Sequence, residues 1–310
     1  MLKFAKRTKK KKRVFPEISE NHIQAYFETP DENLNRYQNS VFPIYSHAFG
    51  FEDARIHLNK NSHNPAFYLV HGLGATIHFF FEGTLFLKEH GFEVFTHSKR
   101  GEISDKDDLT GLDVEMLVDD MEKQIDRVGL QEAHIIASSF GGILSLRLAE
   151  RRPDFAQSIT LIGSFLNFNW GLEHEVGFDV LKRVNPNKLP ATDLGPFLPQ
   201  MQFIRERSTK VMQYVLKEYE TLPVNKLFEY VSYLKKMDYT QNPPKIHCPL
   251  LILHGEQDNV VTMKAYKTLK ETYREATAIL LPNCGHGPFL SKPATLYTEI
   301  LRHATQSVLA

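Results

Sequence analysis

Short apolar runs alternate with longer amphipathic stretches over much of the chain. The runs at residues 67–70, 92–95, 134–137, 158–162, 250–253 and 278–281 have the length and composition of buried strands. Between them lie helix-like stretches at 79–89, 114–128, 142–150 and 263–273, and a closing helix is expected from Pro293. In 114–128 apolar residues recur at three- and four-residue spacing, and Gly129 is placed to end that helix. The alternation predicts an α/β protein, in which helices cover both faces of a parallel sheet.

The alternation stops between residues 164 and 245. This stretch contains breaks such as Asn185-Pro186 and Gly195-Pro196, and helix-like segments at 203–219 and 225–237, but no convincing strand. We therefore expect a first part of the core at 31–164, a helical cap at 165–245 and a second part of the core at 246–310. Residues 41–49 and 54–58 are candidates for an antiparallel start to the sheet. A cap inserted in this way covers the carboxyl edge of the sheet, where open α/β sheets bind ligands.

The first residues are strongly basic. Residues 3–13 carry eight Lys and Arg side chains and no acid, although the formal net charge of the chain is zero. This run predicts either a flexible, solvated tail over residues 1–30 or an arm that is attracted to an anionic surface. No nucleic-acid-binding motif accompanies the run, so we expect no nucleic-acid partner, while peripheral contact with a membrane remains open.

Neither a signal peptide nor a membrane span is expected. The basic run is not followed by an apolar region of signal-peptide length, and no stretch approaches the roughly 20 apolar residues that cross a bilayer. We therefore expect a soluble, cytoplasmic protein. Its two cysteines, Cys248 and Cys284, are too few for a disulfide framework and are expected at opposite ends of neighbouring strands, so we expect both to be reduced.

Two serines stand side by side in the stretch HIIASSFGGI at residues 134–143. A serine nucleophile at a tight strand-to-helix turn needs small residues two positions before it and two after it. For Ser138 these neighbours are the large residues Ile136 and Phe140, whereas for Ser139 they are Ala137 and Gly141. Ser139 is therefore the candidate nucleophile. The pattern alone is a modest signal, because small residues are common at such turns.

A serine at this type of turn works with an acid and a histidine that follow it along the chain, in the order Ser, Asp, His. This sequence contains both in that order. Asp258 lies just after the predicted strand 250–253, and His286 lies between two glycines just after the strand 278–281. In the predicted mechanism Ser139 attacks a carbonyl, His286 accepts its proton, and Asp258 orients the imidazole. Each residue alone is also typical of a surface loop, but together with the serine they favour a catalytic triad. Glu256 is the reserve acid.

The negative charge of a tetrahedral intermediate needs backbone N–H donors. We expect one from Phe140, directly after the nucleophile, and one from Leu73 in the segment HGLG at 71–74, where glycines allow the chain to turn back. The alternative is that HGLG only ends a strand.

These motifs resemble those of the α/β-hydrolase fold superfamily, in its capped, esterase-like branch. The resemblance rests on HGLG at 71–74, ASSFGG at 137–142, HGEQD at 254–258 and NCGHGPF at 283–289. It implies a mostly parallel eight-stranded sheet, a helical cap after the sixth strand, and the triad Ser139, Asp258 and His286. It also implies that residues 98–101 form a loop with a structural role. Ala137 departs from the usual glycine, and the bulky Phe140 is expected to narrow the acyl side of the pocket.

The sequence thus predicts a serine hydrolase that cleaves a carboxylic ester or thioester through an acyl-enzyme on Ser139. A peptidase or amidase, a C–C hydrolase, and a non-catalytic ligand receptor or scaffold remain alternatives. The chain has no metal-binding motif and no nucleotide-binding glycine loop, so we expect no metal and no cofactor.

We expect the partner to be a small acyl substrate, either free or carrier-bound, and the oligomeric state is open. The cap segment mixes aromatic and basic residues, which fits either an amphipathic lid or a surface that docks an acidic carrier. The basic residues are Arg205, Arg207, Lys210, Lys217, Lys235 and Lys236.

Overall fold

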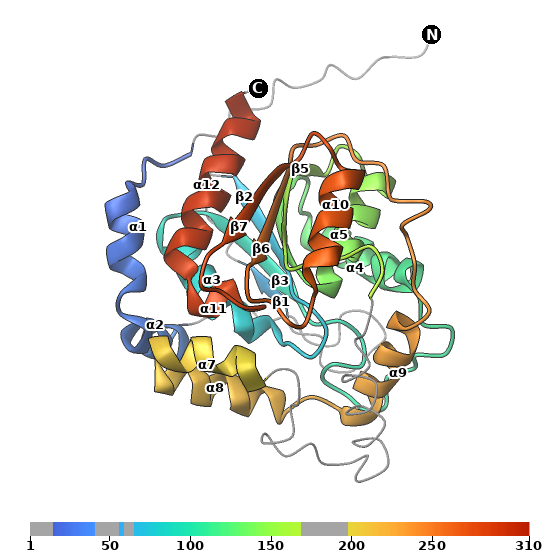
Figure 1. Cartoon of the computed structure of the whole chain (residues 1–310), viewed down its shortest axis with the longest axis horizontal. Coiled ribbons are helices and arrows are strands. Elements are labelled where there is room, and N and C mark those ends of the chain that lie inside the picture. Colours follow the sequence, from blue (N-terminus) through green and yellow to red (C-terminus); the bar gives the residue numbers. More distant parts are fainter. Residues whose placement is uncertain (1–14, 41–55, 59–64, 169–197, 310) are drawn as a thin grey trace.

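The computed structural model describes residues 15–40, 56–58, 65–168 and 198–309, and its centre is a mixed sheet (Figure 1). The strands of this part of the chain are β1 (Ile56–Leu58), β2 (Ala66–Val70), β3 (Glu93–His97), β4 (Ala133–Ser138), β5 (Ala156–Ile162), β6 (Leu250–Gly255) and β7 (Thr277–Leu281). Their order across the sheet is β1-β3-β2-β4-β5-β6-β7. Strand β1 runs antiparallel to β3, and the remaining pairs are parallel. The predicted α/β class with a mostly parallel sheet is confirmed.

The number of strands differs from the expected eight. The described residues contain seven strands, six of them parallel to one another. The antiparallel start predicted at 54–58 is present as β1, while the strand predicted at 41–49 lies outside the described residues. The helices of the cap segment follow β5, which is the fifth strand of the described part of the chain.

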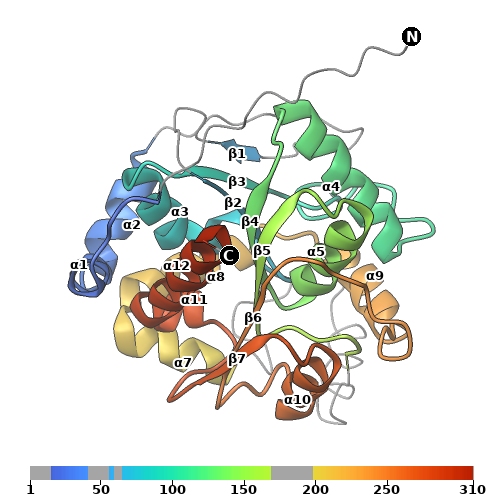
Figure 2. The same ribbon diagram turned by 90° about the horizontal axis from the view of Figure 1, so that it is seen from above.

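Helices cover both faces of the sheet (Figure 2). On one face lie α3 (Phe81–Glu89), preceded by the 3₁₀ helix η1 (Ile77–Phe80), and α12 (Pro293–Leu309), preceded by the short α11 (Pro288–Ser291). On the other face lie α4 (Val114–Val128), α5 (Phe140–Arg151) and α10 (Met263–Thr272). Strand β2 contributes to both cores: Tyr68 and Val70 join one buried cluster, and Phe67 and Leu69 join the other. Each such side chain stabilises the fold by roughly 1.5–3 kcal/mol.

Helix α4 has the bounds that the apolar spacing predicts. The carboxylate of Asp113 accepts a hydrogen bond from the backbone N–H of Met116 at 2.7 Å and caps the first turn. Gly129 follows the last turn with a φ of 69°, a conformation that glycine adopts without steric cost. The apolar stripe of the helix is buried at Val114, Leu117, Val118, Met121, Ile125 and Val128.

The first described helix begins inside the segment predicted to be a flexible tail. A flexible tail was expected up to residue 30, but α1 (Glu20–Phe27) lies inside that range and α2 (Pro30–Gln38) follows it. Ile23 and Phe27 lie one helical turn apart on α1 and are both buried. The ring of Phe27 stacks on Tyr297 of α12, with 5.4 Å between ring centroids. Two apolar residues in a polar stretch thus dock α1, and the basic run at 3–13 lies outside the described residues.

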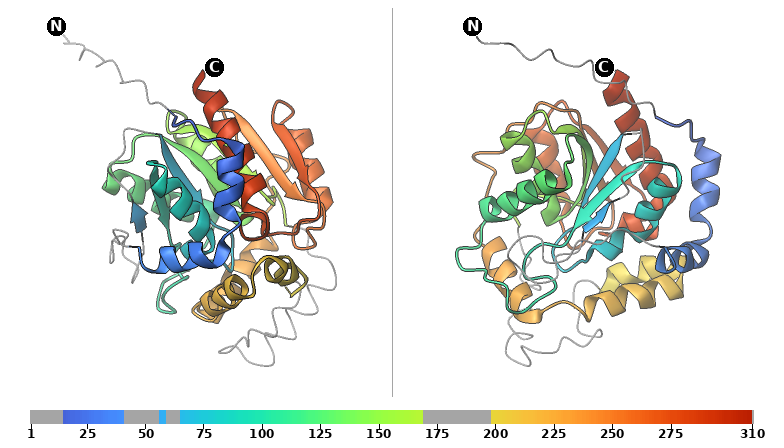
Figure 3. Two further views of the ribbon diagram at one scale, coloured as in Figure 1. Left: turned by 90° about the vertical axis from the view of Figure 1, so that its left-hand side faces the viewer. Right: turned by 180° about the vertical axis from the view of Figure 1, so that it is seen from behind.

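Three helices of the cap segment are described: α7 (Leu198–Arg207), α8 (Thr209–Tyr219) and α9 (Val224–Leu234). All three lie beyond the same edge of the sheet, α7 beside α8 and α9 apart from them (Figure 3). The continuous helix predicted at 203–219 is divided at Ser208, whose hydroxyl accepts a hydrogen bond from the N–H of Val211 and caps α8. The division of the chain into core and cap remains our proposal.

Cys248 precedes β6 and Cys284 follows β7. Because these strands are parallel neighbours, the two thiols lie toward opposite ends of the sheet, and both cysteines are free. Within the described residues, no helix combines the length and the apolar character that crossing a membrane requires.

Candidate active site

Ser139 occupies a strained turn between β4 and α5. Its φ of 51° and ψ of −122° are rare for a residue with a side chain and cost on the order of 1–3 kcal/mol. Two backbone hydrogen bonds fix the turn: the N–H of Ser139 donates to the carbonyl oxygen of Ile162 at 2.8 Å, and the N–H of Gly142 donates to the carbonyl oxygen of Ser139 at 2.9 Å. The surrounding sheet therefore holds the hydroxyl-bearing residue in a conformation that it would not adopt alone.

The glycines after Ser139 allow this turn to pack against its neighbours. A Cβ at Gly141 would lie 2.4 Å from the carbonyl oxygen of Val70, which is closer than van der Waals contact permits. A Cβ at Gly142 would lie 2.4 Å from the Oγ of Ser164. The close approach falls two residues after Ser139, where the steric argument for this serine requires a small residue.

Asp258 and His286 form a direct pair. The Nδ1 of His286 lies 2.8 Å from the Oδ2 of Asp258, whose side chain is fully buried. The other carboxylate oxygen, Oδ1, accepts hydrogen bonds from the N–H groups of Val260 and Val261, both at 2.9 Å. Because these donors fix the carboxylate, its free oxygen is aimed at the imidazole. The reserve acid Glu256 is exposed to solvent.

The turn after β5 connects the serine with this pair. Ile162 accepts the N–H of Ser139, and the next residue, Gly163, has a φ of 52°. A Cβ at Gly163 would lie 3.1 Å from both Asp258 Oδ2 and His286 Nδ1. Ser139 therefore contacts the last residue of β5, and the Asp–His pair lies against the next residue, Gly163. The three predicted residues gather at the carboxyl ends of β4, β6 and β7.

The two predicted oxyanion donors, Leu73 and Phe140, belong to segments beside the turn at Ser139. A Cβ at Gly72 would lie 2.8 Å from the Cβ of Ser139 and 3.5 Å from its Oγ, so the segment 71–74 passes directly beside the serine. Leu73 follows Gly72, and Phe140 begins α5. The backbone N–H groups at the start of a helix carry partial positive charge, which suits them to bind an oxyanion.

A buried charged cluster behind this segment was not foreseen from the sequence. Lys99 and Glu102 form an ion pair with Nζ and Oε1 2.6 Å apart, and the Nε2 of His71 lies 3.3 Å from Glu102 Oε2. The three side chains are almost completely buried. Burial lowers the pKa of Lys99 even though Glu102 acts in the opposite direction. Burial alone would raise the pKa of Glu102, but its interactions with His71 and Lys99 outweigh burial, and the pKa lies below its usual value.

The cap segment reaches the same region. A Cβ at Gly74 would lie 3.7 Å from the ring of Tyr219, at the end of α8, and 3.8 Å from Leu227 of α9. The ring of Phe140 is fully buried and lies edge-on to Tyr230 of α9, with centroids 6.1 Å apart. Helices α8 and α9 thus cover the segment 71–74 and the start of α5. The expectation that Phe140 narrows the acyl side of the pocket stays a prediction.

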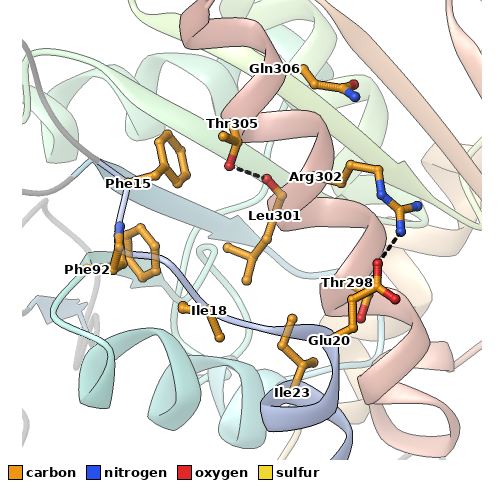
Figure 4. Close-up of a pocket in the computed structure, with 11 residues that line it drawn as sticks. Phe15, Ile18, Glu20, Ile23, Phe92, Thr298, Leu301, Arg302, Thr305 and Gln306 are labelled. Carbon is orange, nitrogen blue, oxygen red and sulfur yellow. Dashed lines mark hydrogen bonds and ion pairs between the residues drawn. The ribbon is translucent and has the colours of Figure 1, made fainter.

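A separate groove lies between the N-terminal segment and α12 (Figure 4). It has a volume of about 280 Å³, and Phe15, Phe92 and Leu301 line its apolar side. Phe92 immediately precedes β3, so this groove is at the amino edge of the sheet, opposite the predicted triad. Among the described residues, no cluster of three or more His, Cys, Asp or Glu side chains is arranged to hold a metal ion.

Known proteins with similar sequences and structures are hydrolases of one fold family. The profile of the α/β hydrolase fold family matches residues 65–293. A pimeloyl-[acyl-carrier protein] methyl ester esterase from Nitrosospira multiformis is 26% identical over 205 residues, which cover 60% of this chain and 73% of the esterase. A bifunctional esterase/perhydrolase from Acinetobacter calcoaceticus is 24% identical over 249 residues, or 76% of this chain and 90% of the relative. The crystal structure of an esterase from Rhodococcus superposes with a TM-score of 0.69 at 18% identity, covering 81% of this chain and 94% of the other.

Proposed function

The chain belongs to the α/β hydrolase fold family, and from this premise we propose that it is a carboxylic ester hydrolase with Ser139 as its nucleophile. The observation that carries the proposal is the arrangement at the sheet edge: a serine at a strained turn lies against the end of β5, and the pair of His286 with the buried Asp258 lies against the next residue, Gly163. Similarity to relatives named as esterases supports the choice of reaction.

The proposed reaction has two halves. Ser139 Oγ attacks the ester carbonyl while His286 accepts its proton, and the imidazolium then returns the proton to the leaving alcohol. Water hydrolyses the acyl-enzyme with His286 again as the base. Asp258 stabilises the imidazolium through Nδ1, and the N–H groups of Leu73 and Phe140 stabilise the oxyanion in both halves.

A panel of substrates tests the reaction class. We expect Ser139-dependent hydrolysis of p-nitrophenyl esters of increasing acyl length, and weaker or no cleavage of the matching p-nitroanilides. Acyl thioesters in the same panel separate a thioesterase from an esterase. Cleavage of the anilides alone would favour the amidase alternative, and no Ser139-dependent turnover of any panel member would favour a receptor or scaffold.

A carrier-bound acyl group is a second candidate substrate. One relative is named for an ester carried on acyl-carrier protein, and the cap segment exposes Arg205, Lys210, Lys217, Lys235 and Lys236. Exposed acids are interspersed with them at Glu206, Glu220 and Glu229, so the surface is only moderately basic. If an acidic carrier docks there, hydrolysis of a carrier-bound methyl ester exceeds that of the free ester at low salt, and the advantage declines as salt rises. Equal rates that do not respond to salt would exclude this substrate class.

A further inference from the structure

The buried ammonium group of Lys99 contacts the backbone of the segment that carries a proposed oxyanion donor. Its Nζ lies 3.2 Å from the carbonyl oxygen of His71, 3.3 Å from that of Gly72 and 3.0 Å from the Nδ1 of His71. Glu102 is the counter-ion, and its Oε2 also accepts the backbone N–H of Lys99 at 2.6 Å. The ammonium group therefore faces Glu102 on one side and, on the other, the ring of His71 and the two carbonyl oxygens immediately before Leu73. The carbonyl oxygen of Gly72 also lies 3.0 Å from the Nδ1 of His71.

The carbonyl of Gly72 and the N–H of Leu73 belong to one peptide unit. The described chain contains no cis peptide bond, so these two groups point in opposite directions across a rigid plane. A donor that binds the carbonyl oxygen on one side therefore fixes the direction of the N–H on the other side.

The order of the strands decides which side each group faces. Strand β2 lies between β3 and β4 (Figure 2). Lys99 follows β3, and Ser139 follows β4, so they approach the segment after β2 from its two flanks. With the carbonyl of Gly72 held toward Lys99, the N–H of Leu73 is directed toward the flank of Ser139, whose Cβ lies 2.8 Å from a Cβ placed on Gly72.

We propose that Lys99 is a positioning residue for the oxyanion hole: it orients the peptide between Gly72 and Leu73 and polarises it, so that the N–H of Leu73 becomes a stronger and better-aimed donor. Glu102 and His71 keep the ammonium group in place. Hydrogen bonds in a chain reinforce one another at low dielectric, so a cationic donor on the carbonyl strengthens the N–H of the same peptide. This role rests on the proposed function.

Stability alone does not account for this cluster. Burying an ammonium and a carboxylate costs several kcal/mol per ion before they pair, and replacing a buried ion pair with apolar residues of similar volume is often neutral or stabilising. A purely structural cluster is therefore replaceable by two methionines without loss of activity, whereas a positioning cluster is not.

The test is the double variant Lys99→Met/Glu102→Met, which removes both members of the ion pair. We expect kcat on the best p-nitrophenyl ester to fall by about 10- to 100-fold, less than the loss of a whole oxyanion donor, while KM stays within about threefold. A trifluoromethyl ketone, which places an oxyanion in the hole once Ser139 adds to it, should bind more weakly by the same factor. The methyl ketone of the same length should bind as it does to the wild type.

The matched control is Arg100→Met/Asp120→Met. Arg100 is the next residue in the same loop, and its side chain forms a partly buried ion pair with Asp120 of α4. We expect its kcat to stay within about threefold of the wild-type value. If the Lys99/Glu102 double variant does not fold, Lys99→Gln, which keeps a polar donor without the charge, takes its place with the same expected direction.

A folded double variant with kcat and trifluoromethyl ketone affinity within twofold of wild type would overturn the positioning role and leave the proposed function intact. A wild-type protein without Ser139-dependent hydrolysis would instead refute the proposed function, and the positioning role with it.

Discussion

The carboxyl edge of the sheet and the cap segment are held in place in different ways. At the edge, backbone atoms contact backbone atoms: the carbonyl oxygen of Val70 lies only 2.4 Å from the position of a Cβ on Gly141, and the N–H of Gln257 donates to the carbonyl oxygen of Cys284 at 2.9 Å. The cap segment is held by side chains from distant parts of the sequence. Arg207 of α7 pairs with the buried Glu82 of α3 and donates to the carbonyl of Phe27 at 2.7 Å.

Because of this difference, we expect the sheet edge to determine the chemical reaction and the cap segment to determine substrate choice. The positions of Ser139, Asp258 and His286 depend on short turns whose residues are fixed by sterics. The cover over them depends on contacts such as the hydrogen bond from Thr76 Oγ1 to Glu218 and the edge-on packing of Phe79 against Tyr219. Changes at the edge should therefore abolish turnover, and changes in the cap segment should alter stability or substrate choice.

The largest effect is expected from Ser139→Ala. Loss of the nucleophile should lower kcat on p-nitrophenyl esters by on the order of 10⁵, about 7 kcal/mol of transition-state stabilisation. The control is Ser138→Ala at the adjacent position, which should retain kcat within about threefold. A decrease of less than tenfold for Ser139→Ala would reject this residue as the nucleophile.

Asp258→Asn should come next. The amide cannot stabilise the imidazolium of His286 and favours the wrong tautomer, so we expect kcat to fall by about 10⁴. Glu256→Gln is the matched control, because this exposed carboxylate should contribute less than threefold. Comparable losses for the two variants would contradict the assignment of Asp258 as the acid.

Arg207→Met tests how the cap segment is held against the core. It leaves the carboxylate of Glu82 buried without its main counter-charge, so we expect about 3–5 kcal/mol less stability in urea unfolding. The double variant Arg207→Met/Glu82→Met removes both charges and should recover most of this loss. If the single and double variants are equally unstable, the ion pair is not what holds α7.

Tyr219→Ala should have the smallest effect on the overall rate and the clearest effect on selectivity. Removing the ring beside Gly74 opens space over the segment 71–74, so the ratio of kcat/KM for octanoyl over butanoyl p-nitrophenyl ester should rise by about tenfold. Tyr273→Ala, at a partly buried tyrosine that follows α10, is the control and should leave the ratio unchanged. An unchanged ratio in Tyr219→Ala would exclude α8 from the acyl site.

Features that depend on neighbouring residues are predicted well from the sequence, whereas contacts between distant residues are not. Helix α4 was predicted with its bounds because its stripe and caps are local, and the tight turn at Ser139 follows from the sizes of Ala137 and Gly141. The docking of α1 through Ile23 and Phe27 was missed, since it depends on a partner almost the whole chain away in Tyr297. Lys99 and Glu102 are indistinguishable from surface charges in the sequence. Only the sheet order brings them behind the segment 71–74.

The central claim is that the strained turn after β4 presents one reactive hydroxyl. The most direct test is to treat the wild-type protein with a fluorophosphonate and locate the adduct by peptide mass spectrometry. We predict a single adduct on Ser139 that is absent from Ser139→Ala. An adduct on Ser138, or equal labelling of the wild type and Ser139→Ala, would contradict the account.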